Sequence, residues 1–186
     1  MDMLRAIAER WYSVHCKFIR QHDPNHLILG DTLENLANFP DWLLPIVKKY
    51  VDVVFIQAFS PFDLQQPHLI RLYEAIGKPI INGDSSFGVP KPPHQTRVKG
   101  WRVKNLKEMG EYYYAYLEGI MSLPFMLGWH HCGFMEQWDG AKPKDAATVN
   151  ENGFMDPFEK PYEEVLTQVI LANSKAVEWH GGNRGQ

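Results

Sequence analysis

The sequence predicts an α/β fold in which parallel β-strands alternate with helices. Short apolar runs without polar alternation recur along the 186-residue chain, and such runs are typical of parallel strands that are covered on both faces. The segments between these runs carry apolar residues at helical spacing. No linker or low-complexity stretch interrupts the pattern, so we expect residues 1–180 to form one domain and 181–186 a disordered tail.

The chain opens with a predicted helix, which is followed by the first strand. Residues 3–22 place apolar side chains at helical spacing on one face, made of Leu4, Ile7, Trp11, Val14 and Phe18. The Asp-Pro pair at 23–24 ends this helix. The short apolar run HLILGD then predicts a strand over 26–31 that ends at Asp31.

The middle of the chain predicts two more strands, with a helix before each. A short helix is expected over 40–50, and the β-branched run VDVVFIQ predicts a strand over 51–57 that ends at Gln57. The next helix covers 64–76, and Gly77 stands where a left-handed residue commonly ends a helix. The run KPIINGD predicts the third strand over 78–84, ending at Asp84.

A long loop over 85–104 separates these elements from the last part of the fold. Asn105 followed by Glu108 forms a capping box, which starts a helix that runs to Ser122. The run PFMLGWHH predicts a fourth strand over 124–131. Pro161 begins the last helix, whose core face is predicted to consist of Val165, Leu166, Val169, Ile170 and Val177.

Each predicted strand ends in polar or aromatic side chains. These are Asp31, Gln57, Asp84 and the group Trp129, His130 and His131. In parallel α/β folds the carboxyl ends of the strands face the ligand, so the four ends together favour a binding or catalytic site. The alternative is that polar residues simply mark where strands leave the core.

Five segments of the chain resemble a known enzyme class. HDPNHLILGD, YVDVVFIQAF, GKPIINGDSSFG, PFMLGWHHCGF and DPFEKPYEEVLTQVILAN are similar, in order and spacing, to the C-terminal half of the (β/α)8-barrel glycoside hydrolases of the retaining clan, of the β-agarase and β-galactosidase-like kind. The resemblance covers about residues 10–180. It implies that the four strands are barrel strands five to eight, a (β/α)4 half of a TIM barrel.

The resemblance implies that Asp84 is the catalytic nucleophile or base. The matching strand of those families ends in a glutamate, whereas this chain has aspartate. Losing one methylene retracts the carboxyl by roughly 1.5 Å, which moves a retaining pair, about 5–5.5 Å apart, towards the inverting range of about 6.5–9.5 Å. The alternative is a carboxylate that caps the following turn beside Ser85 and Ser86.

The partner acid in those families comes from strand four, which would precede Met1. Glu136 or Asp139 could replace it. Sugar-positioning roles are expected for Gln57, Trp129 and His131, and more weakly for the remaining candidates, Asp31, Trp101 and His130. The alternative for Trp129 is a packed core aromatic. No metal is expected, because neighbouring strand residues such as His130 and His131 point to opposite faces.

Composition limits the partners. The formal net charge of -3 disfavours nucleic acid and acidic membranes. No run reaches membrane-spanning length, and no signal-peptide pattern opens the chain. No cofactor is expected, because a nucleotide-binding sheet would need a glycine-rich loop that the sequence lacks.

The loop around Trp101 is rich in cations. It suits an anionic saccharide or is simply solvated, and its cationic residues are Lys91, His94, Arg97, Lys99, Arg102 and Lys104.

A half-barrel leaves sheet edges and an apolar face uncovered. We therefore expect a homodimer through these edges or this face, unless the loops at 85–104 and 132–160 cover the sheet. The predicted function is that of a glycoside hydrolase-related protein that acts on or binds a galactan-like carbohydrate, with weak hydrolysis by this chain alone. The alternative is a non-catalytic, carbohydrate-binding or assembly half-barrel that has lost its acid/base carboxylate.

Overall fold

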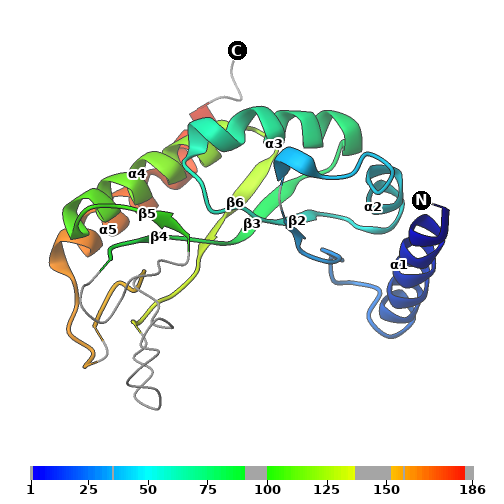
Figure 1. The fold of residues 1–186 in the computed structure, drawn as a ribbon, viewed down its shortest axis with the longest axis horizontal. Coiled ribbons are helices and arrows are strands. Elements are labelled where there is room, and N and C mark those ends of the chain that lie inside the picture. The colour runs from blue at the N-terminus through cyan, green and yellow to red at the C-terminus, as the bar shows by residue number, and fades with distance from the viewer. Residues whose placement is uncertain (1, 35, 91–99, 137–151, 157, 183–186) are drawn as a thin grey trace.

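A computed structural model describes residues 2–34, 36–90, 100–136, 152–156 and 158–182. Within these residues, one four-stranded parallel sheet forms the centre of the fold, in the order β1-β2-β3-β6. Its strands are β1 (Leu33–Glu34), β2 (Val54–Gln57), β3 (Ile80–Ser85) and β6 (Met126–His131). Helices connect successive strands, and α3, α4 and α5 arch over the sheet (Figure 1). The predicted α/β class is confirmed, and the arrangement is consistent with part of a (β/α)8 barrel.

The described helices are close to those that the spacing of apolar residues predicts. They are α1 (Asp2–His22), α2 (Leu44–Tyr50), α3 (Phe62–Ile76), α4 (Leu106–Ser122) and α5 (Glu163–Gly182), with a short 3-10 helix η1 (Leu36–Asn38). Gly77 ends α3 with a φ of 69°, and its amide donates to the Tyr73 carbonyl. Asn105 caps α4 by accepting a hydrogen bond from the Glu108 amide at 2.8 Å.

The core lies between the sheet and the helices. Alternate strand residues point to opposite faces, so Ile56, Ile80 and Met126 are fully buried on the helix side. They pack with Leu69 of α3 and Ile120 of α4, among others. The intervening strand residues, on the opposite face, are more exposed; they include Phe55, Ile81 and Leu127.

The first predicted strand was wrong in position. The structure places β1 at Leu33–Glu34 and not at 26–31, so Asp31 is not a strand end. Gly30 takes a φ of 76°, which turns the backbone out of the extended run. The Ile28 carbonyl still accepts hydrogen bonds from the amides of Asp52 and Val53, which ties this segment to the start of β2.

The outermost helices differ from the prediction in which face they bury. Helix α1 buries Tyr12 and Cys16, whereas most of its predicted apolar face is exposed: Leu4, Ile7, Trp11 and Phe18. Helix α5 buries Val165, Val169 and Ala172, but the predicted core residues Ile170 and Val177 are exposed. Helical spacing identifies an apolar stripe, but it does not show whether the same chain covers that stripe.

Two short strands lie where the sequence predicted only a loop. β4 (Phe87–Gly88) and β5 (Trp101–Arg102) pair in parallel as a separate two-stranded sheet. Helix α5 continues through Gly181 and Gly182, which the sequence analysis placed in a disordered tail. Residues 183–186 lie outside the described part. None of the described helices is long and apolar enough to cross a membrane.

Candidate functional site

Three polar residues form a row at the carboxyl ends of neighbouring strands. Glu34 of β1 is in register with Gln57 of β2, and Gln57 is in register with Asp84 of β3. Parallel strands lie about 4.8 Å apart, so the backbones of Glu34 and Asp84 are roughly 10 Å apart with Gln57 between them. The row therefore places two carboxylates on either side of an amide.

Asp84 and Gln57 are joined directly. The Gln57 side-chain amide donates a hydrogen bond to Asp84 Oδ2 at 2.5 Å, and both residues are half-buried. The residue before Asp84 must be small, because a Cβ built on Gly83 would lie 1.9 Å from the Phe55 ring. The ring of Phe55 thus lies against the backbone of β3 at Gly83, the residue before Asp84. Gln57 and Asp84 thus lie together, as the sequence analysis expected for the carboxyl ends of neighbouring strands.

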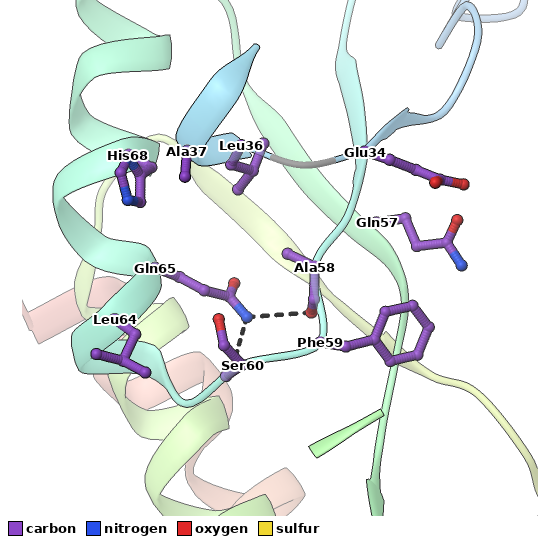
Figure 2. Close-up of a pocket in the computed structure, with 10 residues that line it drawn as sticks. All are labelled: Glu34, Leu36, Ala37, Gln57, Ala58, Phe59, Ser60, Leu64, Gln65 and His68. Atoms are coloured by element: carbon purple, nitrogen blue, oxygen red, sulfur yellow. Dashed lines mark hydrogen bonds between the residues drawn. The ribbon is translucent and has the colours of Figure 1, made fainter. Parts of the chain in front are cut away.

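Glu34 was missed by the sequence analysis, which ended the first strand at Asp31. It lines an open pocket of about 570 Å³ together with Gln57 of β2, Phe59 of the loop after β2, and residues of η1 and α3. In Figure 2 the side chains of Glu34, Gln57 and Phe59 extend to one side, and those of Leu36 and His68 lie on the other. Only the Leu-Glu pair at 33–34 could have indicated this strand end in the sequence.

A buried hydrogen-bond network lies behind the row. The Tyr116 hydroxyl donates to Gln65 Oε1 at 2.7 Å and accepts from Asn82 Nδ2 at 2.5 Å. Gln65 Nε2 in turn donates to the carbonyls of Ala58 and Ser60, at 3.0 and 2.5 Å (Figure 2). Burial raises the pKa of Tyr116 well above its usual range, so this hydroxyl stays protonated. The network ties β3, α3 and α4 to the loop after β2.

Trp129 is packed among aromatic rings on the helix side of the sheet. Its ring centroid lies 4.6 Å from those of Tyr113 and Tyr116 and 6.0 Å from that of Phe87. Its indole N–H is buried and has no hydrogen-bond partner among the described residues. Trp129 therefore lies as the alternative in the sequence analysis described it, as a packed core aromatic, and it does not form an open platform for a sugar ring.

The two histidines that follow take opposite sides of β6. His130 is exposed. His131 Nε2 donates to the Asn152 carbonyl at 2.7 Å, and its ring stacks on Phe154 at 4.5 Å. Burial lowers the pKa of His131 from 6.5 to about 4, against the raising effects of the Asn152 carbonyl and of Asp84. His131 is therefore neutral at pH 7 and fastens residues 152–154 to the end of β6.

The low pKa of His131 predicts that the protein loses stability in mild acid. His131 takes up a proton near pH 6.5 in the unfolded chain and only near pH 4 in the folded chain. The stability that the neutral His131 contributes is therefore complete above pH 6.5 and is lost as the pH falls towards 4. The full loss is on the order of 3 kcal/mol. Urea denaturation at pH 7 and pH 5 should show the fall in the wild type, and His131→Phe should reduce it. The matched variant His130→Phe should show the same fall in stability as the wild type. If the free energy of unfolding falls equally between pH 7 and pH 5 in all three proteins, His131 is not the group responsible.

The other predicted residues lie apart from the row. Asp31 is exposed and accepts a hydrogen bond from Trp11 Nε1 of α1 at 2.8 Å. Trp101 is half-buried on β5, in register with Phe87. Glu136 is buried, and its carboxylate accepts a hydrogen bond from the hydroxyl of Tyr162, whose pKa is raised by burial first and then by this contact. Asp139 and the cations at 91–99 lie outside the described residues.

Comparisons with solved structures identify the fold. An exo-beta-agarase superposes with a TM-score of 0.80 at 22% identity, over 95% of this chain and 23% of its own. An agarase superposes with a TM-score of 0.80 at 19% identity, over 95% of this chain and 27% of its own. A GH2 beta-galacturonidase from Eisenbergiella tayi bound to galacturonate superposes with a TM-score of 0.59 at 16% identity, over 89% of this chain and 30% of its own. No protein-family model and no curated protein matches the chain.

The chain is similar in fold to part of these agarase and galacturonidase structures. It spans about a quarter of the agarase chains that it resembles, 23% and 27% of the two above. Because the identities are low, the likeness establishes the fold and does not carry an activity. Among the described residues, no group of three or more His, Cys, Asp or Glu side chains is placed so that it could hold a metal ion.

Proposed function

We propose that the row of Glu34, Gln57 and Asp84 is the carbohydrate site of a glycoside hydrolase-related protein. In this proposal the chain corresponds to strands five to eight of the barrel, and Asp84 occupies the position of the nucleophile. The observation that carries the proposal is the hydrogen bond from Gln57 to Asp84 at a parallel strand end, in register with Glu34. Strand ends of this kind are where (β/α)8 enzymes hold their catalytic residues.

The roles follow from position and exposure. Asp84 would act as nucleophile or base, and Gln57 would orient the Asp84 carboxylate and bond a sugar hydroxyl. Glu34 is a better second carboxylate than the expected Glu136, because Glu34 is exposed whereas Glu136 is buried. With backbones roughly 10 Å apart, the carboxyls of Glu34 and Asp84 suit the inverting separation of about 6.5–9.5 Å better than the retaining one. His130, exposed at the end of β6, would contact the sugar in place of the packed Trp129.

The proposed substrate is a galactan-like saccharide. Support comes from the structural relatives, which include agarases and a galacturonidase bound to galacturonate. A neutral agarose-derived hexasaccharide and an oligogalacturonate of the same length are suitable probes, because they separate a neutral preference from an anionic one. We expect one of them to bind, measured by isothermal titration calorimetry.

Variants in the row test the site itself. Gln57→Ala should weaken binding by about 10-fold to 100-fold, because it removes the hydrogen bond that orients the charged Asp84 carboxylate, and a hydrogen bond to a charged group contributes about 1.5–3 kcal/mol. Asp84→Asn keeps the shape but removes the charge, and should weaken binding to a similar degree. Asp63→Asn, an exposed aspartate on α3, is the matched control and should bind normally. If neither saccharide binds, or if the row variants bind as the control does, the proposal is wrong.

A non-catalytic carbohydrate-binding protein is the second candidate. One observation favours it: Glu136 is buried and held by Tyr162 away from solvent. The sequence resemblance, which implies a glutamate where this chain has Asp84, points the same way. Such a protein would bind the saccharide with the same dependence on Gln57 and Asp84 but would not cleave it. Hydrolysis measurements therefore separate the two candidates after binding has been established.

A further inference from the structure

The two outermost helices expose apolar stripes that the described part of the chain does not cover. On α1, Ile7 is 57% exposed, Trp11 52% and Phe18 56%, at a spacing that places them on one face. On α5, Ile170 is 67% exposed and Val177 is 83% exposed, one heptad apart. The two helices lie at opposite ends of the molecule in Figure 1. Exposed stripes of this kind mark interaction surfaces.

The sheet ends in the same two places. Among the described residues, β1 pairs only with β2, and β6 pairs only with β3, so both edges are free. All four strands run in one direction, which means that the free edge of β1 can accept the free edge of a second β6. Open parallel edges are rare in monomers because their backbone groups lack partners.

The exposed area of the chain is large for its mass. A compact monomer of 21.5 kDa is expected to expose about 9,200 Å², whereas this chain exposes 11228 Å². The excess of about 2,000 Å² exceeds the roughly 800 Å² that each partner contributes to a standard interface. The uncovered surface is therefore sufficient for a stable complex.

The charges of the two helices indicate what covers the stripes. Helix α1 carries a formal charge of +2, from the four bases Arg5, Arg10, Lys17 and Arg20 against Asp2 and Glu9. Helix α5 carries a formal charge of -2, from Glu163, Glu164 and Glu178 against Lys175. The two helices thus carry opposite net charge as well as exposed apolar stripes, so α1 of one copy complements α5 of another.

We propose that the chain forms a two-fold dimer in which α1 packs against α5 of the second copy and β1 pairs with β6 of the second copy. Two such contacts join the described strands into one parallel ring of eight, the number in a (β/α)8 barrel. The two copies bring ten described α-helices, whereas the barrel has eight. In the proposed dimer, α1 of one copy and α5 of the other would lie side by side where the two sheets join, which accounts for the additional helix at each of the two joins.

The dimer also completes the strand-end row. The free edge of β1, which ends in Glu34, would lie beside the end of β6 of the second copy, where His130 is exposed. Each row would then contain residues from both copies. The dimer does not depend on which ligand the row binds, so its test needs no saccharide.

Light scattering at micromolar concentration tests the assembly. We expect twice the chain mass of 21.5 kDa, and we expect Ile7→Glu and Val177→Glu each to give monomers, because each places a charge in the buried junction. Ile70→Glu changes an exposed apolar residue of the central helix α3 and should leave the dimer intact. Circular dichroism of each variant confirms that it is folded.

Cross-linking tests the arrangement independently of stability. Ile7→Cys and Val177→Cys proteins, purified separately, mixed and oxidised, should form a disulfide between the two variants, with the wild type as the background. A monomer of 21.5 kDa would overturn the proposal, since the faces would then be covered by another polypeptide or by none. A dimer that tolerates both glutamate variants, or that links position 7 only to position 7, would equally overturn it.

Discussion

Replacing Trp129 with alanine is expected to lower the free energy of unfolding by about 3–5 kcal/mol, the usual cost of removing a packed aromatic side chain. The ring contacts Tyr113, Tyr116 and Phe87, which belong to α4 and β4. Its removal therefore leaves a cavity where three elements meet. Urea denaturation followed by far-ultraviolet circular dichroism measures the loss.

His130→Ala is the matched control for this experiment. His130 is the next residue on the same strand and is exposed, so its removal should change stability by less than about 0.5 kcal/mol. The same change should weaken saccharide binding if His130 contacts the ligand. If Trp129→Ala kept full stability and lost only binding, the ring would be a sugar platform, and its role in the core would have been assigned wrongly.

Hydrolysis of an aryl galactoside by this chain is expected to be weak, most clearly for a poor leaving group, because Glu34, the proposed second carboxylate, is exposed to water and is not enclosed as an effective general acid would be. A phenolate with a high pKa needs a proton from a general acid, and general acid catalysis is worth about 10²–10⁴-fold. A dinitrophenolate leaves without that proton. We expect the dinitrophenyl galactoside to be cleaved at a measurable rate that depends on Asp84, and the unsubstituted phenyl galactoside to be cleaved hardly at all.

The variants separate the candidate acids. If phenyl galactoside is turned over efficiently and Glu34→Gln abolishes this turnover, Glu34 is a working acid and the expectation of weak hydrolysis is wrong. If Glu136→Gln abolishes it instead, the buried carboxylate is the one that acts. Asp63→Asn again serves as the control for a change of charge alone.

The fold was largely predictable because its signals are local. Apolar runs located β2, β3 and β6 to within a few residues, and Gly77 and Asn105 marked helix ends by conformation and capping. The first strand was misplaced because its strongest apolar run, 26–31, is turned aside at Gly30. A side chain at that position would collide with Val51 and Tyr12, which are tertiary neighbours that the sequence does not show.

The candidate site was predictable only in part. Gln57 and Asp84 meet because parallel strands align their carboxyl ends, a rule that needs no side-chain detail. Glu34 was lost with the misplaced strand. Trp129 and His131 pack towards α4 because the register between β3 and β6 shifts after Met126, which changes the face that the later residues of β6 occupy. The sequence pattern does not reveal such a shift. Strand register therefore determines which residues form the row, whereas tertiary packing determines which of the nearby side chains are exposed.

The buried network around Tyr116 has a consequence for how a ligand would be received. Gln65 holds two carbonyls of the loop after β2, and Asn82 of β3 reaches the same loop and the same hydroxyl. The backbone that carries Gln57 and Asp84 is therefore held in place before any ligand arrives. A saccharide entering this site meets side chains whose freedom has already been lost, so little ordering entropy opposes its binding. The amide protons of Asn82 and Ala58 should accordingly exchange with solvent at the same slow rate in the free and the bound protein.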